Sequence, residues 1–201
     1  MKRIAVLVSG RGSNLQALID AERKGELGGA IALVISNVPG AHALDRARLA
    51  GIETVVIDHR GRLREDYDRD LLSVLQERHI DVVCLAGFMR ILSAIFIRTF
   101  GGPIINIHPS LLPAFAGKDA QRQAFEHGVK VSGATVHLVD EGLDSGPILM
   151  QEAVEVRDDD TADALAARIL ETEHRIYPLA VHLLCRGRLR LEGRRAILEV
   201  P

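Results

Sequence analysis

Two polar side chains, Asn106 and His108, stand two positions apart in the apolar run 103–113. In a strand, this spacing places both on one face and turns the neighbouring isoleucines to the other. Pro109 cannot donate to a sheet ladder and favours extended geometry before it, so the strand ends at His108. Ligands of open α/β sheets bind at this end of the strands. The alternative is a core histidine whose ring is satisfied, but the shared face favours a site.

A glycine-rich turn, Ser-Gly-Arg-Gly-Ser-Asn at 9–14, follows the apolar run 3–8 and precedes helical spacing from Leu15. Backbone N–H groups at a helix start bind anions, and glycine allows a phosphate to approach. The dinucleotide pattern G-x-G-x-x-G is not met, because Leu15 replaces its third glycine, and the strand at 30–35 is not followed by an acid. The turn therefore favours a monophosphate over NAD, although a merely tight strand-to-helix turn is equally compatible.

Three carboxylates, Asp140, Glu141 and Asp144, fall within five residues of the segment 140–147. Such a cluster resembles an oxygen-ligand cation site, but its spacing is not that of an EF-hand loop. For Asp140 and Glu141 we expect a solvated acidic turn.

The rest of the chain alternates short apolar runs with helical spacing, which predicts an α/β fold with a mostly parallel twisted sheet and helices on both faces. Strands are predicted at 3–8, 30–35, 54–57, 81–86, 103–108, 133–139 and 148–156. Helices are predicted at 15–22, 41–50, 66–79, 94–100, 119–125 and 161–174, with Ser93, Asp119 and 158–161 as N-caps. Pro178 is expected to start or kink a further helix that Gly187 ends, and 188–201 to form a short strand or arm.

Composition limits the class of protein. The chain has 201 residues, of which 47% are hydrophobic and 26% charged, as expected of one globular domain. Its net charge of −2 shows no excess of basic residues of the kind that binds nucleic acid. We expect no signal peptide and no membrane span. Cys84 and Cys185 lie far apart in apolar runs, which indicates buried thiols in a reducing cytoplasm.

Four segments, at 9–14, 85–92, 106–113 and 140–147, together resemble the phosphoribosylglycinamide formyltransferases, and the resemblance runs from Lys2 to about Gly187. The block Asn-Ile-His-Pro-Ser-Leu-Leu-Pro with the later Asp-x-Gly-Pro is typical of folate-dependent formyltransferases in general. The glycine turn points to the glycinamide ribonucleotide member.

The resemblance implies a Rossmann-like formyltransferase fold and formyl transfer from 10-formyltetrahydrofolate to the amine of 5′-phosphoribosylglycinamide in purine biosynthesis, without metal or covalent intermediate. It implies one domain over 1–201, with a phosphate-binding half at 1–100, a catalytic half at 101–187 and a tail. It also implies small-molecule substrates, no nucleic acid or membrane partner, and a monomer or homodimer in the cytoplasm.

Residue roles follow from the same resemblance. The implied catalytic residues are Asn106, His108 and Asp144. The implied ribonucleotide-binding residues are Gly12, Ser13, Asn14, Leu15, Gln16 and Glu173. The implied folate-binding residues are Arg64, Met89, Arg90, Ile91, Leu92 and Asn106. The chain departs from its relatives at Ala116, often Pro or Lys, and at Asp119, where some members have a second histidine.

The chemistry of these residue types agrees with the resemblance. Attack of an amine on a formyl carbon creates a tetrahedral oxyanion, to which the Asn106 amide and a protonated His108 can donate. Asp144 is of the right type to favour the charged imidazole and to take part in proton transfer.

Three other functions fit parts of the sequence. A formyltetrahydrofolate hydrolase would use water in place of the amine, and usually carries an additional amino-terminal domain. A methionyl-tRNA formyltransferase would need a further basic domain. A non-enzymatic phosphate binder would keep the glycine turn but would be expected to lose the catalytic residues, and all three are present.

Overall fold

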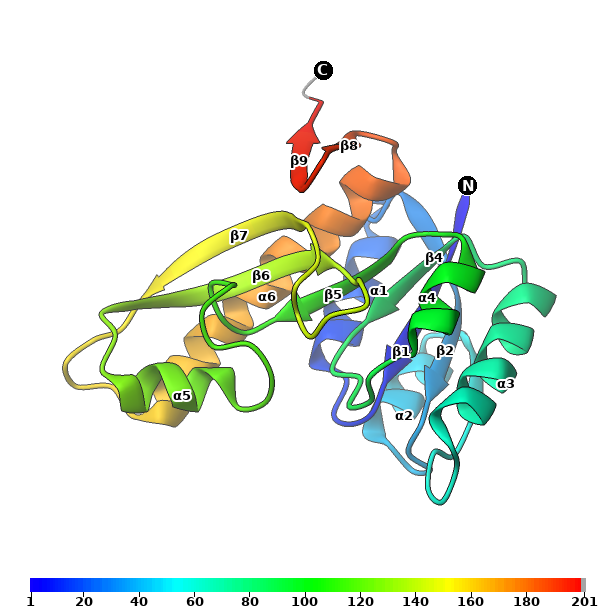
Figure 1. Cartoon of the computed structure of the whole chain (residues 1–201), viewed down its shortest axis with the longest axis horizontal. Coiled ribbons are helices and arrows are strands. Elements are labelled where there is room, and N and C mark those ends of the chain that lie inside the picture. Colours follow the sequence, from blue (N-terminus) through cyan, green and yellow to red (C-terminus); the bar gives the residue numbers. More distant parts are fainter. Residues whose placement is uncertain (200–201) are drawn as a thin grey trace.

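Nine strands form one sheet in the computed structural model, which describes residues 1–199 (Figure 1). The order across the sheet is β3-β2-β1-β4-β5-β6-β7-β9-β8. The strands are β1 (Lys2–Val8), β2 (Gly29–Ser36), β3 (Glu53–Val56), β4 (Val82–Leu85), β5 (Ile104–His108), β6 (Val131–Leu138), β7 (Ile148–Glu155), β8 (Leu189–Glu192) and β9 (Arg195–Leu198). The five strands from β3 to β5 are parallel, whereas β6 and β7 each run antiparallel to the strand before. The predicted, mostly parallel sheet is confirmed.

Helices cover both faces of this sheet (Figure 1). They are α1 (Ser13–Arg23), α2 (His42–Leu49), α3 (Arg64–Glu77), α4 (Ala94–Phe100), α5 (Ala120–His127) and α6 (Ala162–Cys185). Apolar side chains of α1, α2 and α6 pack in one core cluster, and those of α3 and α4 pack in a second cluster on the opposite face. Ser93 caps α4 as predicted, since its hydroxyl accepts the N–H of Phe96 at 3.1 Å.

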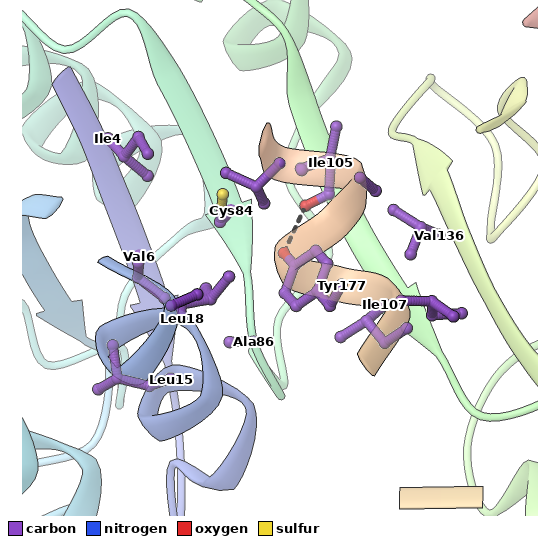
Figure 2. Packing of buried hydrophobic residues seen from close by; sticks show 14 of the residues in the cluster. Ile4, Val6, Leu15, Leu18, Cys84, Ala86, Ile105, Ile107, Val136 and Tyr177 are labelled. Atoms are coloured by element: carbon purple, nitrogen blue, oxygen red, sulfur yellow. Dashed lines mark hydrogen bonds between the residues drawn. The ribbon is translucent and has the colours of Figure 1, made fainter. Parts of the chain in front are cut away.

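The parallel strands are apolar at almost every position because both of their faces are buried. In β1, Ile4 and Val6 contribute to the α1/α6 cluster, and Ala5 and Leu7 to the α3/α4 cluster. Figure 2 shows Tyr177 of α6 in the first of these clusters, with its hydroxyl directed at the Ile105 carbonyl. The same hydroxyl donates to the carbonyl of Leu85 at 2.8 Å. This bond satisfies the one polar group of a fully buried ring.

The central strand β5 has the predicted division of its faces. Ile105 and Ile107 point into the α1/α6 cluster beside Tyr177 (Figure 2). Because side chains alternate along a strand, Asn106 and His108 point to the other face of the sheet.

Several local predictions are wrong. The α6 helix continues through Pro178 to Cys185, so Pro178 does not start a new helix, which was one of the two expectations for it. Pro178 is itself buried, and packing of Tyr177 and Val181 on the sheet outweighs the lost helical hydrogen bond. Cys185 is only half-buried, not buried.

The predicted N-cap of α5 is also wrong in its chemistry. Asp119 occupies the N-cap position, but its backbone φ is 55°, and its side chain makes no capping hydrogen bond within the described chain. Gly128 ends the helix at φ 76°, as predicted.

The tail forms a hairpin of β8 and β9 that extends the sheet beyond β7. Leu189 and Ala196 pack against the α1/α6 cluster. Val200 and Pro201, which belong to the predicted tail, lie outside the described residues. Within residues 1–199, helices are too short or too polar to traverse a bilayer.

Candidate active site

Asn106 and His108 lie at the carboxyl end of β5, between β4 and the antiparallel strand β6. His108 is buried and Asn106 half-buried. The strand register places His137 opposite Asn106, and Thr135 opposite His108. Directly opposite residues of an antiparallel pair point to the same face, so two imidazoles, an amide and a hydroxyl gather there.

The ring of His108 has an acceptor at each nitrogen. Its Nε2–H donates to the carbonyl of Phe115 at 2.9 Å, since a carbonyl can only accept. Its Nδ1 lies 3.4 Å from Oδ2 of Asp144. The turn that carries Phe115 is stabilised by a hydrogen bond, because the hydroxyl of Ser110 donates to the carbonyl of Ala114 at 2.6 Å. A doubly protonated His108 would therefore find an acceptor on both sides.

Asp144 reaches this cluster from the loop between β6 and β7. Its Oδ2 accepts the backbone N–H of Gly117 at 2.8 Å as well as facing His108, and its Oδ1 lies 3.7 Å from Nε2 of His137. The carboxylate is largely buried, with 13% of the side chain exposed. The structure thus brings together the three residues that the sequence singles out as catalytic.

His137 is the fourth member of the cluster, and the sequence reasoning missed it. Its Nδ1–H donates to the carbonyl of Leu138 at 2.8 Å, so in the neutral ring Nε2 is free to accept the amide N–H of Asn106 at 3.2 Å. Burial lowers the pKa of His137, partly offset by the Leu138 carbonyl and the Asp144 carboxylate. A signal was available, because Thr135 and His137 repeat the i, i+2 polar spacing of Asn106 and His108 in a second apolar strand.

This cluster is suited to acyl transfer. An amide nitrogen carries two N–H groups, so Asn106 keeps one donor after bonding to His137. That N–H and an N–H of His108 can both donate to an oxygen that becomes negative in the reaction. The Asp144 carboxylate can accept a proton.

The glycine turn after β1 has the backbone geometry that favours anion binding. Gly12 has φ 75°, and a Cβ at this position would lie 2.6 Å from Cβ of Ala43, so only glycine fits. The first N–H groups of α1, from Ser13 onward, have no acceptor within the helix. Arg46 of α2 donates from Nε to the carbonyl of Arg11 at 2.9 Å and fixes the turn from outside. Backbone donors and the helix dipole therefore face the same point.

Asn14 and Glu173, both predicted to contact the ribonucleotide, are bonded to each other. Nδ2 of Asn14 donates to Oε2 of Glu173 at 2.7 Å. Glu173 is only 5% exposed, and this burial raises its pKa to about 7, against the opposing effect of the Asn14 bond. One N–H of the Asn14 amide is therefore engaged by Glu173, and the other stays available for the predicted phosphate contact.

Leu15 and Gln16 are placed less favourably for side-chain contacts with a phosphate. Leu15 is fully buried in the core, so only its backbone N–H can face the anion site. The Gln16 amide donates to Asp20 at 2.9 Å and accepts from Arg46 at 3.2 Å.

The segment 89–92, predicted to bind folate, presents alternate side chains to solvent. Met89 is 68% exposed and Ile91 54%, whereas Leu92 is buried in the α3/α4 cluster. The Leu92 side chain packs in the core, and its place beside the folate stays a prediction. The Met89 N–H donates to Oγ of Ser9 at 2.7 Å, which joins this segment to the glycine turn.

Arg90 is held against the start of α3. Its guanidinium lies 4.4 Å from the centroid of the Tyr67 ring, and it donates to the carbonyl of Leu63 at 3.4 Å. Arg64 follows Leu63 directly and is exposed. The predicted folate residues therefore border one another, at the same end of the sheet as the cluster.

Comparisons with known proteins agree with this arrangement. A family model described as formyl transferase matches residues 2–181. Phosphoribosylglycinamide formyltransferase of Escherichia coli is 45% identical over 98% of this chain and 93% of its own length. The trifunctional purine biosynthetic protein adenosine-3 of Drosophila melanogaster is 51% identical over 92% of this chain. The chain spans only 14% of that larger relative.

Solved structures give the same result. The crystal structure of glycinamide ribonucleotide transformylase 1 from Symbiobacterium toebii matches with a TM-score of 0.95 and 50% identity. The match covers 98% of this chain and 94% of that one. With the family model matching most of its length and full-length relatives well above 30% identity, this chain belongs to the formyl transferase family.

Proposed function

We propose that the chain transfers the formyl group of 10-formyltetrahydrofolate to the amine of 5′-phosphoribosylglycinamide. The products are formylglycinamide ribonucleotide and tetrahydrofolate. The observation that supports this most directly is the cluster of Asn106, His108, His137 and Asp144 at the carboxyl end of β5. The glycine turn that follows β1 lies at the same edge of the parallel sheet. A formyl acceptor anchored by its phosphate would meet the cluster at this end of the sheet.

In the proposed reaction, the amine nitrogen bonds to the formyl carbon and the carbonyl oxygen becomes an oxyanion. The free N–H of Asn106 donates to that oxygen, and His137, by accepting from the other N–H, holds the amide in place. The bond from carbon to the folate nitrogen then breaks, and that nitrogen receives a proton. The attacking amine loses one proton, for which the Asp144 carboxylate is the acceptor, directly or through water.

His108 supplies the proton for the leaving nitrogen. Its Nε2–H is held by the Phe115 carbonyl, and its Nδ1 faces Asp144. Substrate must therefore replace Phe115 as the acceptor, which requires the turn around residue 115 to give way. Met89 and Ile91 are exposed apolar side chains suited to a flat folate ring.

The test is formyl loss from 10-formyltetrahydrofolate with and without 5′-phosphoribosylglycinamide. We expect loss only in the presence of the acceptor, with formylglycinamide ribonucleotide formed in equal amount. Equal rates of formyl loss with and without the acceptor would contradict this proposal and support a formyltetrahydrofolate hydrolase instead. The negative control is Asn106→Ala, which removes the oxyanion donor and should abolish most of either reaction.

A further inference from the structure

The loop 139–147, between β6 and β7, holds Asp144 in an unusual backbone conformation. Asp144 has φ 48°, a left-handed value that residues other than glycine adopt uncommonly. Such a conformation persists where the surrounding structure determines it. The contacts that hold this loop therefore decide where the carboxylate points.

Hydrogen bonds hold the loop in its turn and at its base. Oδ1 of Asp140 accepts the N–H of Gly142 at 3.1 Å and the hydroxyl of Ser145 at 2.7 Å. The carbonyl of Pro147 accepts the N–H of Leu138 at 2.9 Å. These bonds, with that from the N–H of Val139 to the Ile104 carbonyl of β5 at 2.8 Å, close the loop, but none of them is made to the Ser145 carbonyl.

One contact next to Asp144 comes from a distant part of the chain. Arg194, in the turn between β8 and β9, donates from its guanidinium to the carbonyl of Ser145, the residue after Asp144. The hairpin that carries Arg194 is docked independently, through the pairing of Arg195 with Ile148 and the packing of Ala196 on the core. A fixed element thus holds the peptide that follows the catalytic carboxylate.

We propose that Arg194 is a positioning residue for Asp144. It keeps the Ser145 peptide in place and thereby directs the carboxylate to His108 and Gly117. The role assigned to Asp144 rests on the proposed function, whereas the structural effect of Arg194 does not.

The first test of the proposal uses a measurement that does not depend on catalytic activity. The N–H of Gly117 donates to Oδ2 of Asp144, so its hydrogen exchange reports whether the carboxylate is in place. We expect Arg194→Ala to accelerate exchange at Gly117 by about threefold to tenfold, the effect of losing one hydrogen bond of ordinary net strength. Arg194→Lys, which keeps a donor, should restore most of the protection.

The matched control is Arg190→Ala in the same hairpin. Arg190 pairs with Glu192 at 2.6 Å and with Glu199 at 3.5 Å, within the tail. This variant removes the same charge and should leave exchange at Gly117 unchanged. An equal change in both variants would mean that the hairpin acts only through general stability and would overturn the proposal.

Kinetics supply the second readout. Arg194→Ala should lower kcat by about threefold to tenfold and leave KM for both substrates within about twofold, because the carboxylate acts on the chemical step. Unchanged exchange at Gly117 together with wild-type kcat would overturn the role of Arg194. If the unaltered enzyme shows no acceptor-dependent transfer, the proposed function fails, and the exchange data still decide the structural proposal.

Discussion

The two oxygens of Asp144 face two imidazole rings whose surroundings differ. His108 has an acceptor beside each nitrogen, whereas His137 has an acceptor at Nδ1 and the Asn106 donor at Nε2. His137 is therefore suited to orient Asn106 as a neutral ring. Burial lowers the pKa of His137, which also favours the neutral form. His108 is suited to carrying the proton.

Asp144→Asn tests the role of the carboxylate. The substitution keeps the size of the side chain but removes the negative charge that faces His108 and the acceptor for the amine proton. Turnover should fall by roughly 100-fold, the usual range for loss of a proton-transfer partner. The measurement is kcat at saturating substrates.

The control is Asp140→Asn in the same loop. Asp140 accepts hydrogen bonds from Gly142 and Ser145 through Oδ1, an oxygen that asparagine retains. The turnover of this variant should stay close to that of the unaltered enzyme. A folded Asp144→Asn variant with near-normal turnover would exclude Asp144 from the mechanism.

Glu173 affects stability through its burial. Its pKa is raised from 4.5 to about 7 in the folded protein, so the folded state binds more protons than the unfolded state between these values. The stabilisation from this group is thus complete below about pH 4.5 and is lost as pH rises through about 7. The difference amounts to about 3 kcal/mol, at 1.36 kcal/mol for each pKa unit.

Glu173→Gln should remove this dependence. Relative to the unaltered protein, the free energy of unfolding of the variant should rise by about 3 kcal/mol between about pH 4.5 and 8. Urea unfolding at both pH values measures it. Glu171→Gln changes the same charge at an exposed position of α6 and should show no such rise. A parallel response of the two variants would contradict the assignment to Glu173.

At the scale of elements, the segment after β4 serves two purposes at alternate positions. Met89 and Ile91 are exposed, and Leu92 lies in the core. Met89→Ala should weaken folate binding while changing the free energy of unfolding by less than about 0.5 kcal/mol. Leu92→Ala should cost about 2–5 kcal/mol of stability. Folate titration and urea unfolding of both variants separate the effects, and a large stability loss in Met89→Ala would place Met89 in the core instead.

Element positions were predictable wherever local signals were strong, and were missed where distant packing prevailed. The i, i+2 pair before Pro109 located β5 and its polar face correctly. Pro178 suggested a helix break, but the apolar face of α6 holds the helix together across it. The pairing of Asn14 with Glu173 had no local signal, because the two residues are 159 positions apart in the chain.

At the scale of the whole molecule, alternation of strands and helices predicted the parallel half of the sheet, since each unit there follows from neighbouring sequence. The remainder depends on pairings between distant segments. His137 could be assigned to the site only once β6 was known to lie antiparallel beside β5. The docking of the β8–β9 hairpin next to β7 likewise has no local signature.

The register between β5 and β6 decides which residues form the site, because only every second residue of each strand faces it. Asn106 faces His137 and His108 faces Thr135, so each strand supplies the site at every second position. Inserting one residue within β6 would turn Thr135 and His137 into the core, and Ala134 and Val136 towards the site. Inserting two would keep the faces but displace His137 by about 7 Å. Changes in chain length within β5 or β6 therefore take the site apart, whatever residues are inserted.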